Sequence, residues 1–331
     1  MAVARPVLTT LFLLALAPGL ARAQSISAEV DGTAGYSTED VKAAGTQLRI
    51  FGEAIAGWRY YAEGSWADVW GPKSDAFGAA YPYNNRFRPM EAYVERTFRP
   101  GRYIAGVKAG QYRTPFGLSS RSDHGYTGFL RAPLIRYGSN WALGNTFFEG
   151  GVSAMAGVPR LFAEMSVARP RDEDSYRRRS GWDKAVRVQG AVGDVIVGAS
   201  HIQMPPAERF TRALGNAEFS GLDVRWMRGG VLLRGEYIDG RPFDGVRTFG
   251  GYIDAIAHRP FMGPVTAVAR AERLDYVAGR SSDYPRRYTT GARIQLASTV
   301  VGHVNVVREM AHRTHPSMTA LDLGVTISGR R

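Results

Sequence analysis

The sequence predicts an all-β chain that forms a transmembrane antiparallel β-barrel of about sixteen strands. Three observations predict this fold. Apolar and polar residues alternate with period two, the alternating segments are long enough to cross a bilayer, and short connections alternate with long ones. The chain has 331 residues, a formal net charge of +12 and no Cys. Without Cys, disulfides, Cys-ligated metals and thiol catalysis are excluded.

The first residues have the pattern of an export signal. Arg5 precedes an apolar stretch over 7–16, and Ala21-Arg22-Ala23 forms a small-residue cleavage site. The stretch is shorter than the ~20 residues of a membrane-spanning helix, which disfavours the alternative of a membrane anchor. We therefore expect residues 1–23 to be a signal peptide and residues 24–331 to form an outer-membrane barrel. Removal of the signal lowers the formal net charge from +12 to +10, because Arg5 and Arg22 are lost.

Alternation is clearest in the last segment of the chain. There Leu321, Leu323, Val325 and Ile327 alternate with Asp322, Gly324, Thr326 and Ser328. Such a strand has one apolar and one polar face. In a barrel the apolar face meets lipid and the polar face lines the lumen, whereas in a soluble sandwich the apolar face would form a core. The segments run for ~10–12 residues, which favours the barrel because soluble strands centre on ~5–6.

The connections support the same fold. Candidate strands cover 25–36, 46–55, 58–68, 89–98, 102–112, 146–156, 160–169, 183–192, 195–203, 216–227, 230–239, 247–257, 264–275, 285–296, 300–310 and 318–328. Every second connection is a tight turn, such as Ala56-Gly57 or Gly193-Asp194, and the others are longer and polar. Short periplasmic turns and long external loops are typical of outer-membrane barrels. The strands around 46–68 are the least well defined by this pattern.

The longest connection, 113–145, lies between the fifth and sixth strands and is a candidate constriction loop. Long loops without secondary structure are usually functional, and a sixteen-stranded barrel leaves a channel that an inward-folded loop would narrow. The loop carries four candidate selectivity residues, Arg113, Arg121, Arg131 and Arg136, against the single acid Asp123. The alternative is an external lid over the mouth.

A family resemblance lies at the start of this loop. The segment Val107-Lys108-Ala109-Gly110-Gln111-Tyr112-Arg113-Thr114-Pro115-Phe116-Gly117-Leu118 resembles the AGQFKTPFGLE-type stretch of the bacterial phosphate-selective porin O and P family. The resemblance implies a sixteen-stranded, anion-preferring homotrimer with the third external loop folded into the channel. The chain departs from that family in using Arg almost exclusively and in ending with Arg330-Arg331 instead of a terminal aromatic residue.

Strand parity predicts which charges face the lumen. The wall residues expected to set selectivity are Lys108, Arg49, Arg59, Arg234, Arg270 and Arg293, with Glu91, Glu95 and Glu149. The same parity adds Arg187, Arg225, Glu53, Glu63, Glu164, Glu236 and Glu272. The acids gather in strands two to seven and the bases in later strands. This separation of charge predicts an electric field directed across the pore. Arg suits oxyanions, so we expect a mild anion preference with phosphate-type oxyanions as candidate solutes. The alternative places the positive charge in external loops such as 169–184, near lipopolysaccharide.

The sequence contains no motif for catalysis. It has no Walker loop, no GxSxG and no HExxH, and its six His are scattered, with His312 and His315 best interpreted as a solvated loop pair. We expect no enzyme activity, no cofactor, no bound metal and no nucleic-acid partner. The predicted function is passive diffusion of small anionic or neutral hydrophilic solutes through a Gram-negative outer-membrane porin, with lipid and lipopolysaccharide as surroundings. The alternatives are a substrate-specific barrel transporter, a non-conducting structural barrel and a periplasmic β-sandwich binding protein.

Overall fold

The computed structural model describes most of the chain after the predicted signal. The described residues are 25–54, 57–72, 76–77, 85, 87–118, 127–136, 148–169, 177–178, 181–209, 212–243, 245–258, 263–278, 281–312 and 316–330. No helix in these ranges is long and apolar enough to cross a membrane.

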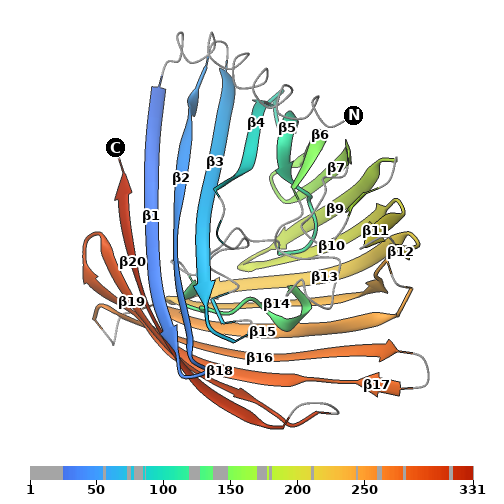
Figure 1. Ribbon diagram of the computed structural model, residues 1–331. Coiled ribbons are helices and arrows are strands. Elements are labelled where there is room, and N and C mark those ends of the chain that lie inside the picture. The colour runs from blue at the N-terminus through green and yellow to red at the C-terminus, as the bar shows by residue number, and fades with distance from the viewer. Residues whose placement is uncertain are drawn as a thin grey trace.

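Sixteen strands form a closed antiparallel barrel (Figure 1). In chain order they are β1 (Ser25–Ser37), β2 (Val41–Glu53), β3 (Trp58–Trp70), β4 (Arg88–Phe98), β5 (Ile104–Arg113), β6 (Phe148–Val158), β7 (Leu161–Arg169), β9 (Asp183–Val192), β10 (Val195–Met204), β13 (Ala217–Arg228), β14 (Val231–Arg241), β15 (Thr248–His258), β16 (Val265–Ala278), β18 (Arg286–Ala297), β19 (Val300–Glu309) and β20 (Met318–Arg330). Each pairs with the next, and β20 pairs with β1 from Glu29↔Arg330 to Ser37↔Asp322. Closure leaves no free sheet edge, which is the condition for a sheet to lie in lipid.

Five short elements of the described chain lie outside this ring. Strand β17 (Ser281–Asp283) extends the pairing of β16. Strands β8 (Arg177–Arg178), β11 (Ala207–Arg209) and β12 (Arg212–Ala213) form a separate small sheet. A 3₁₀ turn, η2 (Leu134–Arg136), belongs to the long connection between β5 and β6.

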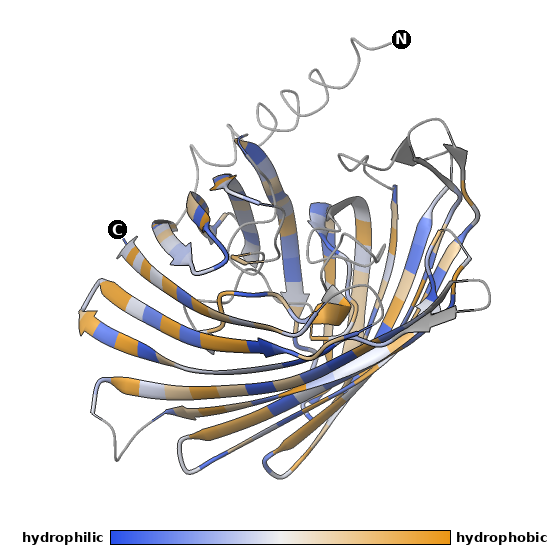
Figure 2. Ribbon diagram, turned by 60° about the horizontal axis from the view of Figure 1, so that its bottom comes forward, coloured by the Kyte–Doolittle hydropathy of each residue, from blue (hydrophilic) through white to orange (hydrophobic). Residues whose placement is uncertain are grey.

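The two faces of the wall differ as the alternation predicts. In β20, Asp322 and Thr326 are buried on the inner side, whereas Leu323 and Ile327 are 39% and 58% exposed on the outer side. Figure 2 shows the same alternation of apolar and polar residues along the strands. The outer apolar rows are not covered by a second protein layer among the described residues, so a β-sandwich is excluded. The predicted fold class is confirmed.

The ends of the barrel also differ. One end has tight turns, and those at Gly193 and Gly229-Gly230 use the positive φ angles of 57°, 59° and 79° that glycine tolerates. The other end carries the longer connections. One predicted boundary moved by five residues. Strand β2 begins at Val41 instead of 46, so the first connection at this end is the turn Thr38–Asp40.

The interior contains apolar packing that the parity argument did not predict. Towards the long-loop end, Ile202, Phe219 and Ile238 point inwards and pack against Phe116 and Ile135 of the long connection. A second cluster stacks the rings of Phe51, Tyr61 and Tyr93 on adjacent strands, with centroids 6.4 and 5.3 Å apart. The lumen is therefore partly filled by protein, which makes the remaining space narrower than the strand count alone implies.

Candidate functional site: the channel constriction

The long connection leaves β5 through a turn that directs it across the barrel. Gly117 adopts a φ of 60°, and its N–H donates to Ser200 Oγ on β10 over 2.9 Å. The N–H of Leu118 then donates to Glu236 Oε1 on β14 over 3.0 Å. Phe116 is buried in the inner apolar cluster described above. The Thr-Pro-Phe-Gly-Leu segment of the family resemblance thus begins the inward path of the loop.

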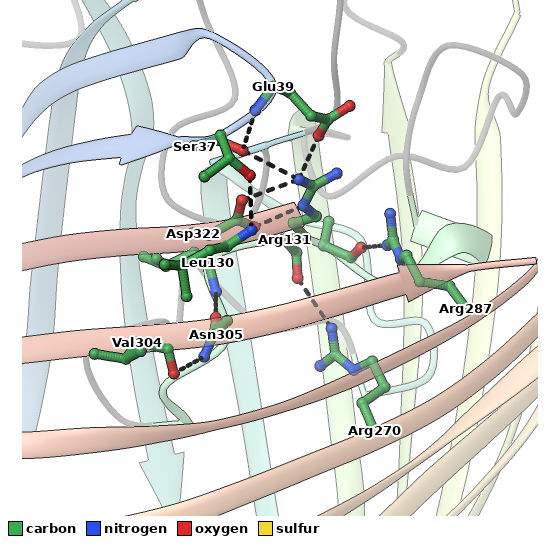
Figure 3. Close-up of polar contacts among 12 residues, drawn as sticks. Ser37, Glu39, Leu130, Arg131, Arg270, Arg287, Val304, Asn305 and Asp322 are labelled. Carbon is green, nitrogen blue, oxygen red and sulfur yellow. Dashed lines mark hydrogen bonds and ion pairs between the residues drawn. The ribbon is translucent and has the colours of Figure 1, made fainter. Parts of the chain in front are cut away.

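The second described part of the loop, 127–136, lies against the inner wall formed by β16, β18, β19 and β20 (Figure 3). The N–H of Leu130 donates to Asn305 Oδ1 on β19 over 2.9 Å, and the N–H of Leu134 donates to Glu272 Oε2 on β16 over 2.6 Å. Both acceptors belong to inward-facing side chains. The described parts of the third external loop therefore lie inside the barrel, as predicted.

Three buried Arg side chains fasten this part of the loop. Arg131, 3% exposed, donates to Asp322 Oδ2 and Oδ1 over 2.7 and 3.0 Å and also pairs with Glu39. Arg270 donates to the carbonyl of Arg131 over 2.9 Å. Arg287 donates to the carbonyl of Ala132 over 2.6 Å (Figure 3). We call Arg131, Arg270 and Arg287 the anchor.

The anchor changes the interpretation of two predicted residues. Arg131 and Arg270 were expected to line the pore, but Arg131 is held by carboxylates and Arg270 is bound by Asp254 over 2.6 Å and stacked 4.0 Å from the Phe129 ring. Their guanidinium groups are used to hold the loop. Arg287, which completes the anchor with Glu272 at 2.8 Å, was not singled out from the sequence.

A cavity of about 420 Å³ remains between the start of the loop and the wall from β4 to β14. We call it the constriction cavity. Its charged lining consists of Glu91, Lys108, Arg113, Glu164, Arg187, Arg225 and Arg234. Acids on β4 and β7 thus share one cavity with bases on β9, β13 and β14, but Lys108 and Arg113 lie on β5 beside the acids, so the lining follows the predicted separation of charge only in part. Five cations face two carboxylates in the described lining.

The cations of the constriction cavity differ in how far they are neutralised. Lys108 lies 3.4 Å from Glu164, and Arg187 binds Asp223 with two hydrogen bonds of 2.6 and 2.9 Å. Arg234 Nε lies 2.9 Å from Asp254, a carboxylate that Arg270 also uses. Arg225 lies directly opposite Arg234 in the β13–β14 register. Within the described part of the chain, the Arg225 guanidinium has no hydrogen bond and no ion pair.

The other predicted residues fall in different places. Arg49 is paired with Asp31 at 2.6 Å and with Glu63 at 3.4 Å, and Arg59 is paired with Glu95 at 3.1 Å. Arg293 faces inwards on β18, beside Gln295 at 3.4 Å. These residues do not line the constriction cavity. Arg121 and the side chains of Arg136 and Glu149 lie outside the described residues.

Several functional residues were missed although the same signal identifies them. The Asp residues that neutralise the wall are Asp31, Asp223, Asp254 and Asp322. Each lies on the inward parity of its strand. Asp223, for example, is two residues from Arg225 and therefore on the same face.

Comparison with known proteins gives structural matches alone. No protein-family model matches the sequence, and no curated protein matches it significantly. An anion-selective porin from Comamonas acidovorans superposes with a TM-score of 0.63 at 14% identity, over 92% of this chain and 99% of that one. Salmonella typhi OmpF gives 0.62 at 10% identity, over 92% and 97%.

A third solved structure also superposes on this chain. Pseudomonas putida OprB gives a TM-score of 0.56 at 9% identity, over 95% of this chain and 96% of that one. The chain has the fold of bacterial outer-membrane porins. At these identities the likeness concerns the fold, and none of the three names supports the phosphate-selective O and P family in particular.

Proposed function

We propose that the chain is a passive, water-filled diffusion channel of a Gram-negative outer membrane, with a mild preference for small anions. The observation that carries this proposal is the constriction cavity, where five cations face two carboxylates and Arg225 has no partner in the described structure. The porin fold and the inward third loop support the channel itself.

The size of the preference follows from elementary electrostatics. A unit charge about 5 Å from the path shifts the energy of a passing ion by about 0.8 kcal/mol in water. Screening at about 0.1 M salt reduces this shift to about 0.5 kcal/mol, and because it has opposite signs for an anion and a cation, the ratio of their permeabilities changes roughly fivefold. Paired bases contribute less, because their carboxylates cancel the field. Raising the ionic strength to about 1 M shortens the Debye length to about 3 Å and weakens the preference.

Phosphate-type oxyanions are the finer part of the proposal. Guanidinium groups present paired donors that match oxyanions, and Arg113, Arg187, Arg225 and Arg234 line the same cavity. Lys108 and Arg113, which belong to the stretch that resembles the porin O and P family, line it as well. We also propose that the chain assembles as a homotrimer, as the family resemblance implies, and that the signal peptide is cleaved after Ala23.

The charged lining distinguishes this proposal from the alternatives. A transporter for an apolar or oligomeric substrate would present aromatic surfaces to its path, but Tyr61, Tyr93 and Tyr112 are at most 9% exposed. Lys108 covers two of these rings at 5.4 and 5.5 Å. The described residues contain no group of three His, Asp or Glu side chains that could hold a metal ion. We propose no enzymatic activity.

Planar-bilayer recording tests the proposal. Purified protein should add discrete conductance steps, and in a tenfold KCl gradient its reversal potential should favour chloride. Arg225→Gln should reduce the permeability ratio roughly fivefold or less. Arg228→Gln is the matched control, because Arg228 lies three residues further on β13 at the tight-turn end and is 76% exposed. Absence of conductance contradicts the channel, and a cation-favouring wild-type potential contradicts the anion preference.

A further inference from the structure

A second hollow lies on the outer face of the barrel wall. It has a volume of about 770 Å³ and lies over β14, β15, β16 and β18. Its walls are formed by Tyr237, Ile253 and Tyr288, which are 47%, 67% and 47% exposed on the outward parity. The loop residues that contact this stretch of wall from inside do not line it. We call this hollow the outer groove.

Small residues keep the outer groove open. Its floor contains Gly251 and Ala271, which face outwards between the larger side chains. A Cβ atom at Gly251 would lie 2.5 Å from the carbonyl oxygen of Glu236, so no side chain fits there. The outcome is a hollow on the outer wall that two tyrosines border.

Cations gather where the outer groove meets the long-loop end. Arg273 and Arg286 both line it, and they lie directly opposite each other in the β16–β18 register. Like charges in directly opposed positions destabilise a sheet unless an anion separates them. Asp275 neutralises Arg273 through two contacts of 2.6 Å. Arg286 is exposed and has no side-chain partner in the described structure.

We propose that the outer groove binds a phosphorylated glycolipid of the outer leaflet, of the lipid A type. An acyl chain lies between Tyr237 and Tyr288, and a phosphate lies against Arg286 beside Arg273. This inference rests on the proposed outer-membrane location. We infer a phosphate as the charged group of the lipid because Arg286 lies at the end of the outer groove that carries the long external loops. A lipid phosphate in the outer leaflet would complement its charge there.

Binding of defined lipids to the full-length protein in detergent tests the assignment. Native mass spectrometry would compare diphosphoryl lipid A, its dephosphorylated form and phosphatidylglycerol. We expect the wild-type protein to retain diphosphoryl lipid A roughly tenfold more tightly than either of the other two. Equal retention of the dephosphorylated form, or of phosphatidylglycerol, would overturn the proposal.

Two variants and two matched controls locate the site. Arg286→Gln removes the free charge and Ala271→Trp fills the floor, so each should abolish the preference for diphosphoryl lipid A. Arg228→Gln and Ala199→Trp change exposed residues of the outer wall away from the groove and should retain it. Equal losses in variants and controls would contradict the site.

The test is separable from that of the proposed function. The outer groove lies outside the lumen, so single-channel conductance of Arg286→Gln should equal that of the wild-type protein. A chain that binds lipid A but never conducts would refute the channel alone. If Ala271→Trp fails to migrate as a folded barrel, the conservative Arg286→Gln variant decides the lipid assignment.

Discussion

Two regions of the inner wall carry Arg side chains in contrasting surroundings. At the wall from β16 to β1, Arg131 of the long connection and Arg270 and Arg287 of the wall are at most 3% exposed. All three are bound to carboxylates, and the two wall residues also bind loop carbonyls. On the wall from β9 to β14, Arg187 and Arg234 are 11% and 10% exposed, and Arg225 has no partner in the described structure. The first group holds the loop, and the second borders the cavity.

The contrast shows that a count of Arg residues does not measure selectivity. A buried charge is costly unless carboxylates and hydrogen bonds compensate it, so the buried anchor is strongly neutralised. A cation beside water does not need full compensation by carboxylates. Its uncompensated charge produces an electric field in the lumen. The burial of each Arg, together with any loop carbonyl that it binds, is therefore what predicts its role.

The largest expected effect comes from breaking the anchor. Arg287→Met would leave Glu272 buried without its ion-pair partner and remove the hydrogen bond to the carbonyl of Ala132. We expect the free energy of unfolding to fall by about 3–5 kcal/mol, measured by denaturant titration of the barrel in vesicles. The double variant Glu272→Leu/Arg287→Met removes both charges and should recover part of the loss. A double variant no more stable than the single one would argue against the buried pair.

A smaller effect should come from releasing a neutralised Arg on each wall. Asp223→Asn frees Arg187 in the constriction cavity and should raise the anion-to-cation permeability ratio by about fivefold or less. Asp322→Asn weakens the hold on Arg131, which Glu39 still pairs and which does not line the cavity. It should leave the reversal potential unchanged. Equal shifts in the two variants would show that the two walls do not differ in function.

Much of the fold was predictable because period-two alternation and connection length are local properties. All sixteen predicted strands are present, and the boundary that moved most is at Val41, where the following Ala43-Ala44-Gly45 gives weak alternation. The inward apolar residues near the long-loop end, such as Ile202 and Phe219, were missed because they pack against a loop and not against lipid.

The site was predictable only in part because pairing between strands is not local. Parity placed Arg225 and Arg234 inside, but their direct opposition depends on the β13–β14 register. The sharing of Asp254 by Arg234 and Arg270 depends on three neighbouring strands. The Lys108–Arg113 stretch was a good guide to the cavity because it adjoins the turn at Gly117.

Single-cysteine labelling tests the central claim most directly, since the chain has no Cys of its own. Arg225→Cys and Val224→Cys place a thiol on adjacent residues of β13, the first facing the cavity and the second 43% exposed on the outer wall. A negatively charged, water-soluble thiol reagent should lower the current and the anion preference of Arg225→Cys and leave Val224→Cys unchanged. A response of Val224→Cys with none from Arg225→Cys would contradict the account.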